Sequence, residues 1–96
     1  MTTLRIEHAI HDYKTWKQAF DRDPADRRGS GVRRYAIHQP IDDEKYIFID
    51  LEFDSVAAAE ALLATMRKVW RSSAAAPALA GEPRTRITDV VEAGDL

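Results

Sequence analysis

Histidines are the only side chains here that titrate near neutral pH without help from their surroundings, and the chain has three, His8, His11 and His38. His8 and His11 lie three positions apart at the end of an alternating segment, with Asp12 beside them. Imidazoles and carboxylates are common ligands of zinc and related metals, so this group could hold an ion. The spacing is not that of a ligand pair on one helix face. We favour a histidine with a structural hydrogen bond, and no metal ligand is assigned.

The third histidine, His38, precedes a turn-rich segment and could lie beside Tyr46 of the following strand. Its imidazole could there act as a general base or bind a ligand. The favoured alternative is a histidine at the surface or at an interface. The sequence has no nucleophile motif, phosphate-binding loop or zinc signature, so it gives no support to a hydrolase, a kinase or a nucleotide-binding protein. No residue is assigned a catalytic role.

Large apolar side chains recur at helical spacing and are typical of a core, yet two tryptophans in so short a chain also leave room for a flat organic ligand between helix and sheet. A tyrosine that faced the helices would bring a hydroxyl group into that space. The candidate ligand-binding residues are Trp16, Phe20, Tyr35, His38, Met66 and Trp70.

The order of elements that must position these residues is βαββαβ. Alternation of apolar and polar residues predicts strands, and apolar residues three and four apart predict helices. Asp12 is placed to cap the first helix, and Asp54 or Ser55 the second. The predicted strands are 4–9, 32–38, 45–53 and 84–91, and the predicted helices are 13–21 and 56–71. The segment 23–31 is a predicted loop with room for one helical turn, and 72–83 is a predicted connector.

An α+β fold, with two helices on one face of a four-stranded antiparallel sheet, accommodates this order most economically. The alternation directs Ile47, Ile49, Leu51 and Phe53 toward the helices. Pairing of Tyr35 with Ile49 then places Arg34 opposite Asp50 and His38 opposite Tyr46 on the far face. This far face contains Tyr46 and Phe48 among charged residues, and central aromatics on an open sheet face usually meet a partner.

These features together resemble the dimeric α+β barrel superfamily, which includes antibiotic biosynthesis monooxygenase-like proteins and small polyketide cyclases. The resemblance rests on the segment DYKTWKQAFD at 12–21, on Arg28 and Gly31, on the hairpin, and on the helix after Asp54 that leads to Gly81 and Pro83. It implies ferredoxin-like subunits that form a homodimer through their open sheet faces. It also implies an apolar small molecule between sheet and helices, and no cofactor.

Two classes of function follow. One is a cofactor-independent monooxygenase or cyclase that acts on an aromatic or polyketide-like substrate while a tyrosine or histidine moves one proton. The other is a non-catalytic dimeric module that binds a small molecule or a protein.

Length and composition limit the remaining classes. The 96 residues, 45% hydrophobic and 31% charged, suit one domain, 1–96, with a core. The 14 basic and 16 acidic residues give a net charge of −2 without a basic block, which argues against nucleic acid as a partner. The absence of cysteine excludes disulfides and thiolate sites. The sequence shows no long apolar stretch, so we expect no membrane association and a cytoplasmic location.

Overall fold

The chain forms the predicted βαββαβ order in a computed structural model that describes residues 1–72 and 78–96. Residues 73–77, which belong to the predicted connector, lie outside the described residues. The six elements are β1 (Thr2–Ala9), α1 (Tyr13–Asp21), β2 (Arg34–His38), β3 (Tyr46–Phe53), α2 (Val56–Trp70) and β4 (Arg84–Asp89).

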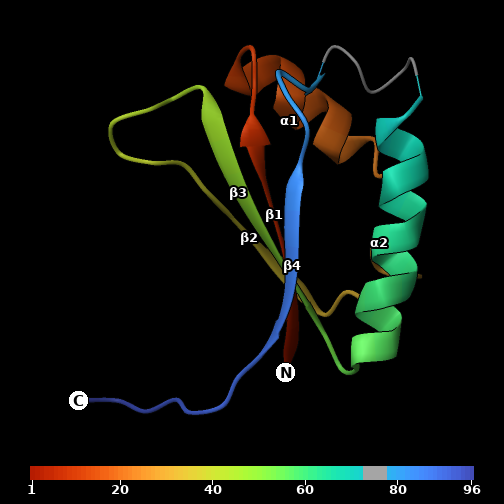
Figure 1. Ribbon diagram of the computed structural model, residues 1–96, viewed down its shortest axis with the longest axis vertical. Coiled ribbons are helices and arrows are strands. Elements are labelled where there is room, and N and C mark those ends of the chain that lie inside the picture. The colour runs from red at the N-terminus through yellow and green to blue at the C-terminus, as the bar shows by residue number, and fades with distance from the viewer. Residues whose placement is uncertain (73–77) are drawn as a thin grey trace.

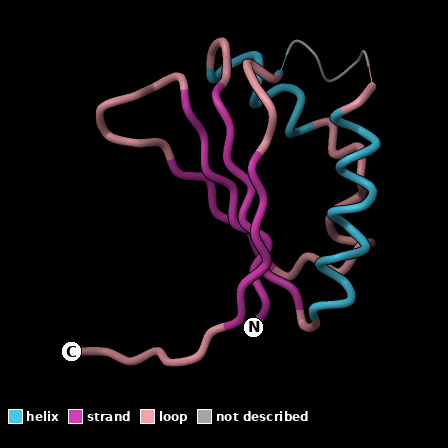
Figure 2. The backbone as a smooth tube through the Cα atoms, in the orientation of Figure 1, coloured by secondary structure: helices cyan, strands magenta, loops and turns pink. Residues whose placement is uncertain are grey.

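The four strands form one antiparallel sheet in the order β2-β3-β1-β4. Figure 1 shows α1 and α2 on one face of this sheet. Figure 2 shows the β2–β3 loop and the C-terminal residues extending to the other side. No element of the described part of the chain covers that far face. The predicted ferredoxin-like α+β fold is therefore confirmed.

Side-chain caps fix where both helices begin. The Asp12 carboxylate accepts a hydrogen bond of 2.8 Å from the backbone N–H of Thr15 at the start of α1. Ser55 does the same for Ala58 at the start of α2, over 3.2 Å, so Ser55 rather than Asp54 is the second cap. Both caps satisfy a backbone donor that the first turn of a helix leaves free.

The predicted pairing of β2 with β3 is wrong by two positions. Arg34 lies opposite Glu52, and His38 lies opposite Phe48 instead of Tyr46. Asp50 is instead engaged by Arg5 of β1, through hydrogen bonds of 2.8 and 2.9 Å.

The physical reason is that the hairpin loop has hydrogen bonds of its own, which the alternation of residue types does not encode. Gln39 donates to the carbonyl of Glu44 over 2.9 Å, and Asp43 accepts from the backbone N–H of Lys45 over 2.9 Å. A shift of two positions leaves every side chain on its predicted face, because side chains alternate with period two.

Apolar side chains from both layers fill the space between sheet and helices. The buried set includes Leu4 and Ile6 of β1, alternate residues of β3, Trp16 of α1 and Leu62 of α2. The segment between α1 and β2 forms consecutive turns, without the helical turn that 24–28 could have formed. Asp23 and Asp26 adopt positive φ angles of 53° and 49° there, a conformation that aspartate tolerates better than most residues. Ala25 of this loop is buried in the core between sheet and helices.

Candidate functional site

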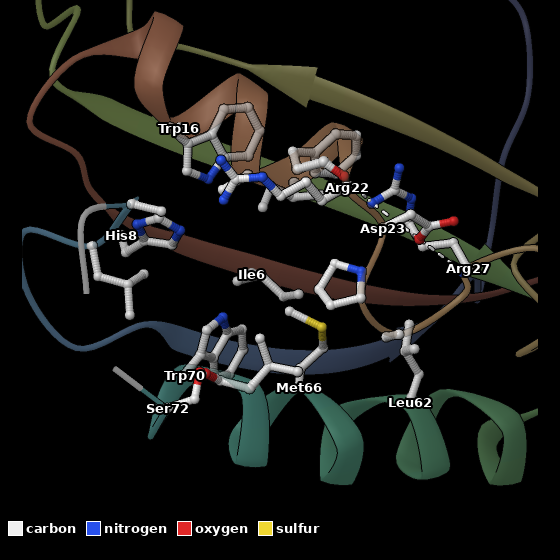
Figure 3. Close-up of a pocket in the computed structure, with 18 of the residues that line it drawn as sticks. Ile6, His8, Trp16, Arg22, Asp23, Arg27, Leu62, Met66, Trp70 and Ser72 are labelled. Atoms are coloured by element: carbon white, nitrogen blue, oxygen red, sulfur yellow. Dashed lines mark hydrogen bonds and ion pairs between the residues drawn. The ribbon is translucent and has the colours of Figure 1, made fainter. Parts of the chain in front are cut away.

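A cavity of about 420 Å³ lies between the helix-facing side of the sheet and the two helices. Ile6 and His8 of β1, together with Ile49 and Leu51 of β3, form its floor. Residues of α1, the following loop, α2 and the segment 78–79 form the rest of its lining (Figure 3). This volume is within the range of pockets that bind drug-sized molecules, and its lining is mostly apolar.

Aromatic side chains of α1 form one wall of the cavity. The Trp16 and Phe20 rings are stacked with centroids 5.1 Å apart, and the Tyr13 ring packs against Trp16 at 5.8 Å. Met66 and Trp70 of α2 lie across the cavity from them (Figure 3). Four of the six candidate ligand-binding residues, Trp16, Phe20, Met66 and Trp70, therefore line one space. A flat apolar molecule could bind between the two helices there.

Tyr35 and His38 do not line this cavity. Tyr35 is on the helix side of the sheet, but β2 is an edge strand, and the helices cover this part of it only partly. Its ring contacts Phe20 at 5.4 Å and remains 53% exposed. His38 is exposed on the far face, because the alternation that turns Ile37 inward turns its neighbour outward. The structure therefore brings neither of these two side chains into the cavity that the tryptophans line.

His8 is the titratable side chain on the floor of the cavity, and it is not among the ligand-binding residues predicted from the sequence. It is 3% exposed. Its Nδ1 lies 2.8 Å from the carbonyl oxygen of Ala9, which also accepts a hydrogen bond of 3.1 Å from the backbone N–H of Ala80. A carbonyl oxygen only accepts hydrogen bonds, so Nδ1 carries the proton.

Burial lowers the pKa of His8, while the hydrogen bond to Ala9 partly opposes that shift. The imidazole is therefore neutral at pH 7, with its lone pair on Nε2. Within the described part of the chain, Nε2 has no hydrogen-bond partner. A signal for this site was present in the sequence, since the alternation that sends Leu4 and Ile6 toward the helices sends His8 there too.

The structural hydrogen bond expected for a histidine at this strand end is present. His11, by contrast, is exposed. The described residues contain no group of three or more histidine, cysteine, aspartate or glutamate side chains that could hold a metal ion. Nor do they include a helix long and apolar enough to cross a bilayer.

Charged side chains border the cavity at the end of α1. The Arg27 guanidinium lies 3.7 Å from the centroid of the Phe20 ring and donates a hydrogen bond of 2.8 Å to the Phe20 carbonyl. It also pairs with Asp23 at 3.4 Å. These contacts hold the aromatic wall against the loop. Arg22 and Lys68 complete the charged lining.

The far face carries a second organised set of side chains. The Tyr46 and Phe48 rings form an edge-to-face pair at 5.3 Å, and the Tyr46 hydroxyl donates to Glu7 over 3.0 Å. The hydrogen bonds from Arg5 hold the pKa of Asp50 below its usual range. Phe48 is partly exposed at the centre of this face.

Comparisons with known proteins give matches at the level of structure. No protein-family model matches the chain, and no curated protein matches it significantly. The structure is similar to that of SnoaB, a cofactor-independent oxygenase from Streptomyces nogalater, with a TM-score of 0.73 and 13% identity over 96% of this chain and 94% of SnoaB.

Two further matches have the same architecture. A dimeric ferredoxin-like protein from an uncultured marine organism gives a TM-score of 0.68 at 10% identity, over 97% of both chains. An antibiotic biosynthesis monooxygenase gives a TM-score of 0.62 at 16% sequence identity, over 96% of this chain and 100% of the other chain. The chain therefore shares the ferredoxin-like fold of these proteins, as its sequence pattern indicated.

Proposed function

We propose that the protein is a cofactor-independent enzyme that binds a flat aromatic molecule in the cavity and removes a proton from an acidic carbon with Nε2 of His8. The observation that carries this proposal is the geometry of His8. Its Nδ1–H is fixed on Ala9, its ring is neutral, and its Nε2, which no described residue engages, is on the floor of a cavity lined by two tryptophans. A general base needs this combination of an unprotonated nitrogen, a fixed orientation and access to the substrate.

The environment of His8 also limits the substrate. Burial disfavours the imidazolium that forms when Nε2 takes a proton, so His8 is a weak base. It can deprotonate only a carbon whose anion is strongly delocalised, as in a methylene group between aromatic rings and conjugated with a ketone. Fused aromatic ketones meet both this need and the flat, apolar shape of the cavity.

One chemical step is shared by an oxygenase and a cyclase, since both begin with a carbanion. In an oxygenase the carbanion reacts with O2 to give a peroxide anion, which takes the proton back from His8 and becomes a hydroperoxide that loses water. One oxygen atom becomes a new ketone, the other leaves as water, and the carbon supplies all the electrons. In a cyclase the same carbanion attacks a second carbonyl group of the substrate. The likeness in fold to SnoaB supports the oxygenase.

Oxygen uptake with anthrone, a tricyclic ketone with an acidic methylene group, tests this function without added metal or cofactor. We expect catalysed uptake, with anthraquinone as product, and a loss of about 100-fold or more in His8→Gln. His11→Gln is the matched control, because that histidine is exposed and outside the cavity. A His8→Gln variant that is folded and fully active would contradict the proposal. Ligand binding without turnover in the wild type would favour a binding module.

We also propose that two copies pack through their far faces. One support is the aromatic pair Tyr46 and Phe48, which lies on a face that no described element covers. The other is the likeness in fold to a dimeric ferredoxin-like protein. Exposed aromatics surrounded by polar groups are typical of such interfaces.

Light scattering coupled to gel filtration tests the dimer. The wild type should have twice the mass of the chain, and Phe48→Glu should be monomeric because it places a charge at the centre of the interface. Val56→Glu, an exposed position at the start of α2 in the opposite layer, should remain dimeric. A wild-type monomer at micromolar concentration would contradict this assembly.

A further inference from the structure

The charges that border the cavity do not cancel. The lining includes three cations, Arg22, Arg27 and Lys68, and one carboxylate, Asp23, in a chain whose net charge is −2. Arg27 is already engaged by Asp23, by the Phe20 carbonyl and by the Phe20 ring. Two cations, Arg22 and Lys68, are therefore left for another role.

Neither of these two side chains has an ion pair or a hydrogen bond with another described residue. Arg22 follows the last residue of α1, and Figure 3 shows its side chain extended along the cavity toward Trp16. Lys68 lies in the last turn of α2, so the other helix supplies it. Both residues are exposed, and they border the same cavity from different elements.

Their position at helix ends offers an alternative explanation. The C-terminal end of a helix carries roughly half a negative unit charge, which a lysine or arginine offsets. Two helix ends amount to about one negative charge, whereas Arg22 and Lys68 supply two positive charges. Since Asp23 and Arg27 neutralise each other, the mouth of the cavity retains a net positive charge.

We propose that the ligand is an aromatic anion, with its rings between Trp16 and Trp70 and its negative group bound by Arg22 and Lys68. This inference rests on the proposed function and narrows its substrate to aromatic compounds that carry a carboxylate, a sulfonate or an ionised phenol. The apolar wall supplies shape and burial, and the two cations fix which end of the molecule faces the mouth. Arg22 and Lys68 are thus specificity-determining residues that take no part in proton transfer.

Two fluorescent probes with the same ring system separate the two contributions. 8-Anilinonaphthalene-1-sulfonate carries a sulfonate, and N-phenyl-1-naphthylamine is its uncharged counterpart. Fluorescence titrations give the Kd of each probe for the wild type and for the double variant Arg22→Gln, Lys68→Gln. Lys14→Gln is the matched control, since it removes an exposed cation of α1 outside the cavity. Ala19→Phe, which fills the cavity from α1, should block both probes.

The double variant should raise the Kd of the sulfonate probe about tenfold, as expected for the loss of charge-assisted contacts, and leave the Kd of the neutral probe within about twofold. Added salt should weaken the binding of the sulfonate probe and leave the binding of the neutral probe unchanged. Equal effects on both probes, or an altered melting temperature with unchanged Kd values, would overturn the inference and leave helix stabilisation as the role of these cations. Failure of the neutral probe to bind the wild type, or its binding to Ala19→Phe, would instead contradict the cavity site on which the inference rests.

Discussion

Replacement of Trp16 by alanine should lower the free energy of unfolding by about 3 to 4 kcal/mol, in the lower part of the range for large aromatic residues. Trp16 is 4% exposed and packs between the Tyr13 and Phe20 rings, at centroid distances of 5.8 and 5.1 Å. Its indole also borders the cavity of about 420 Å³, so it has fewer neighbours to lose than a tryptophan in a filled core.

Urea unfolding and thermal melts measure this effect, and the expected loss corresponds to about 12 °C or more for a domain of this size. Tyr13→Ala is the matched control. It removes a ring that contacts the same indole from an exposed position, so it should cost about 1 kcal/mol or less. A melting temperature of Trp16→Ala within a degree or two of the wild type would refute the placement of Trp16 in the core. A melting temperature equal to that of Tyr13→Ala would refute it as well.

Three further predictions concern the sheet pairing, the buried histidine and the second helix cap. A double-mutant cycle on Arg5 and Asp50 should give a coupling energy of about 1 kcal/mol. The same cycle on Arg34 and Asp50 should give a coupling energy near zero. A larger coupling energy for Arg34 than for Arg5 would support the register that the sequence predicted. His8 has a lower pKa in the folded than in the unfolded chain, so the unfolded state takes up the proton first as the pH falls below about 6.5, and stability decreases there. Urea unfolding at about pH 7 and about pH 5 should show a smaller loss of stability for His8→Gln than for the wild type, and equal losses would count against a buried neutral imidazole. Ser55→Ala should cost about 1 kcal/mol through loss of the cap on Ala58, and a thermal melt identical to that of the wild type would show that the cap contributes nothing.

Alternation of residue types was sufficient to predict which face of the sheet each side chain occupies. Ile47, Ile49, Leu51 and Phe53 are all buried on the helix side, as predicted. The register of the hairpin could not be predicted in the same way. Alternation is unchanged by a shift of two positions, and it does not reveal hydrogen bonds within the loop such as that from Gln39 to Glu44.

The candidate site was predictable where it depends on a single element and unpredictable where it depends on strand order. Trp16 and Phe20 on α1, like Met66 and Trp70 on α2, share a face that helical spacing reveals. Tyr35 faces the helix side as predicted, but the sequence does not say that β2 is an edge strand, where its ring stays partly exposed beside Phe20 and outside the cavity.

His8 and the two cations line the cavity but were not predicted to do so, because nothing in the sequence indicated that they lie near one another. The proximity of His8 and His11 along the chain drew attention to a metal site, although His8 is buried beneath the helices and His11 is exposed. Arg22 and Lys68 are far apart in sequence, and only the packing of both helices on one sheet face brings them to the same cavity.

The most direct test of the central claim is a nitrogen-15 NMR titration of His8 in the intact protein, which reports both the tautomer and the pKa. The structure predicts a proton on Nδ1, an unprotonated Nε2, and a pKa below the usual value of about 6.5. His11, exposed on the segment before α1, serves as an internal reference in the same spectra. A proton on Nε2 in the neutral form, or a His8 pKa at or above that of a free histidine, would contradict the assignment of His8 as the base of this cavity.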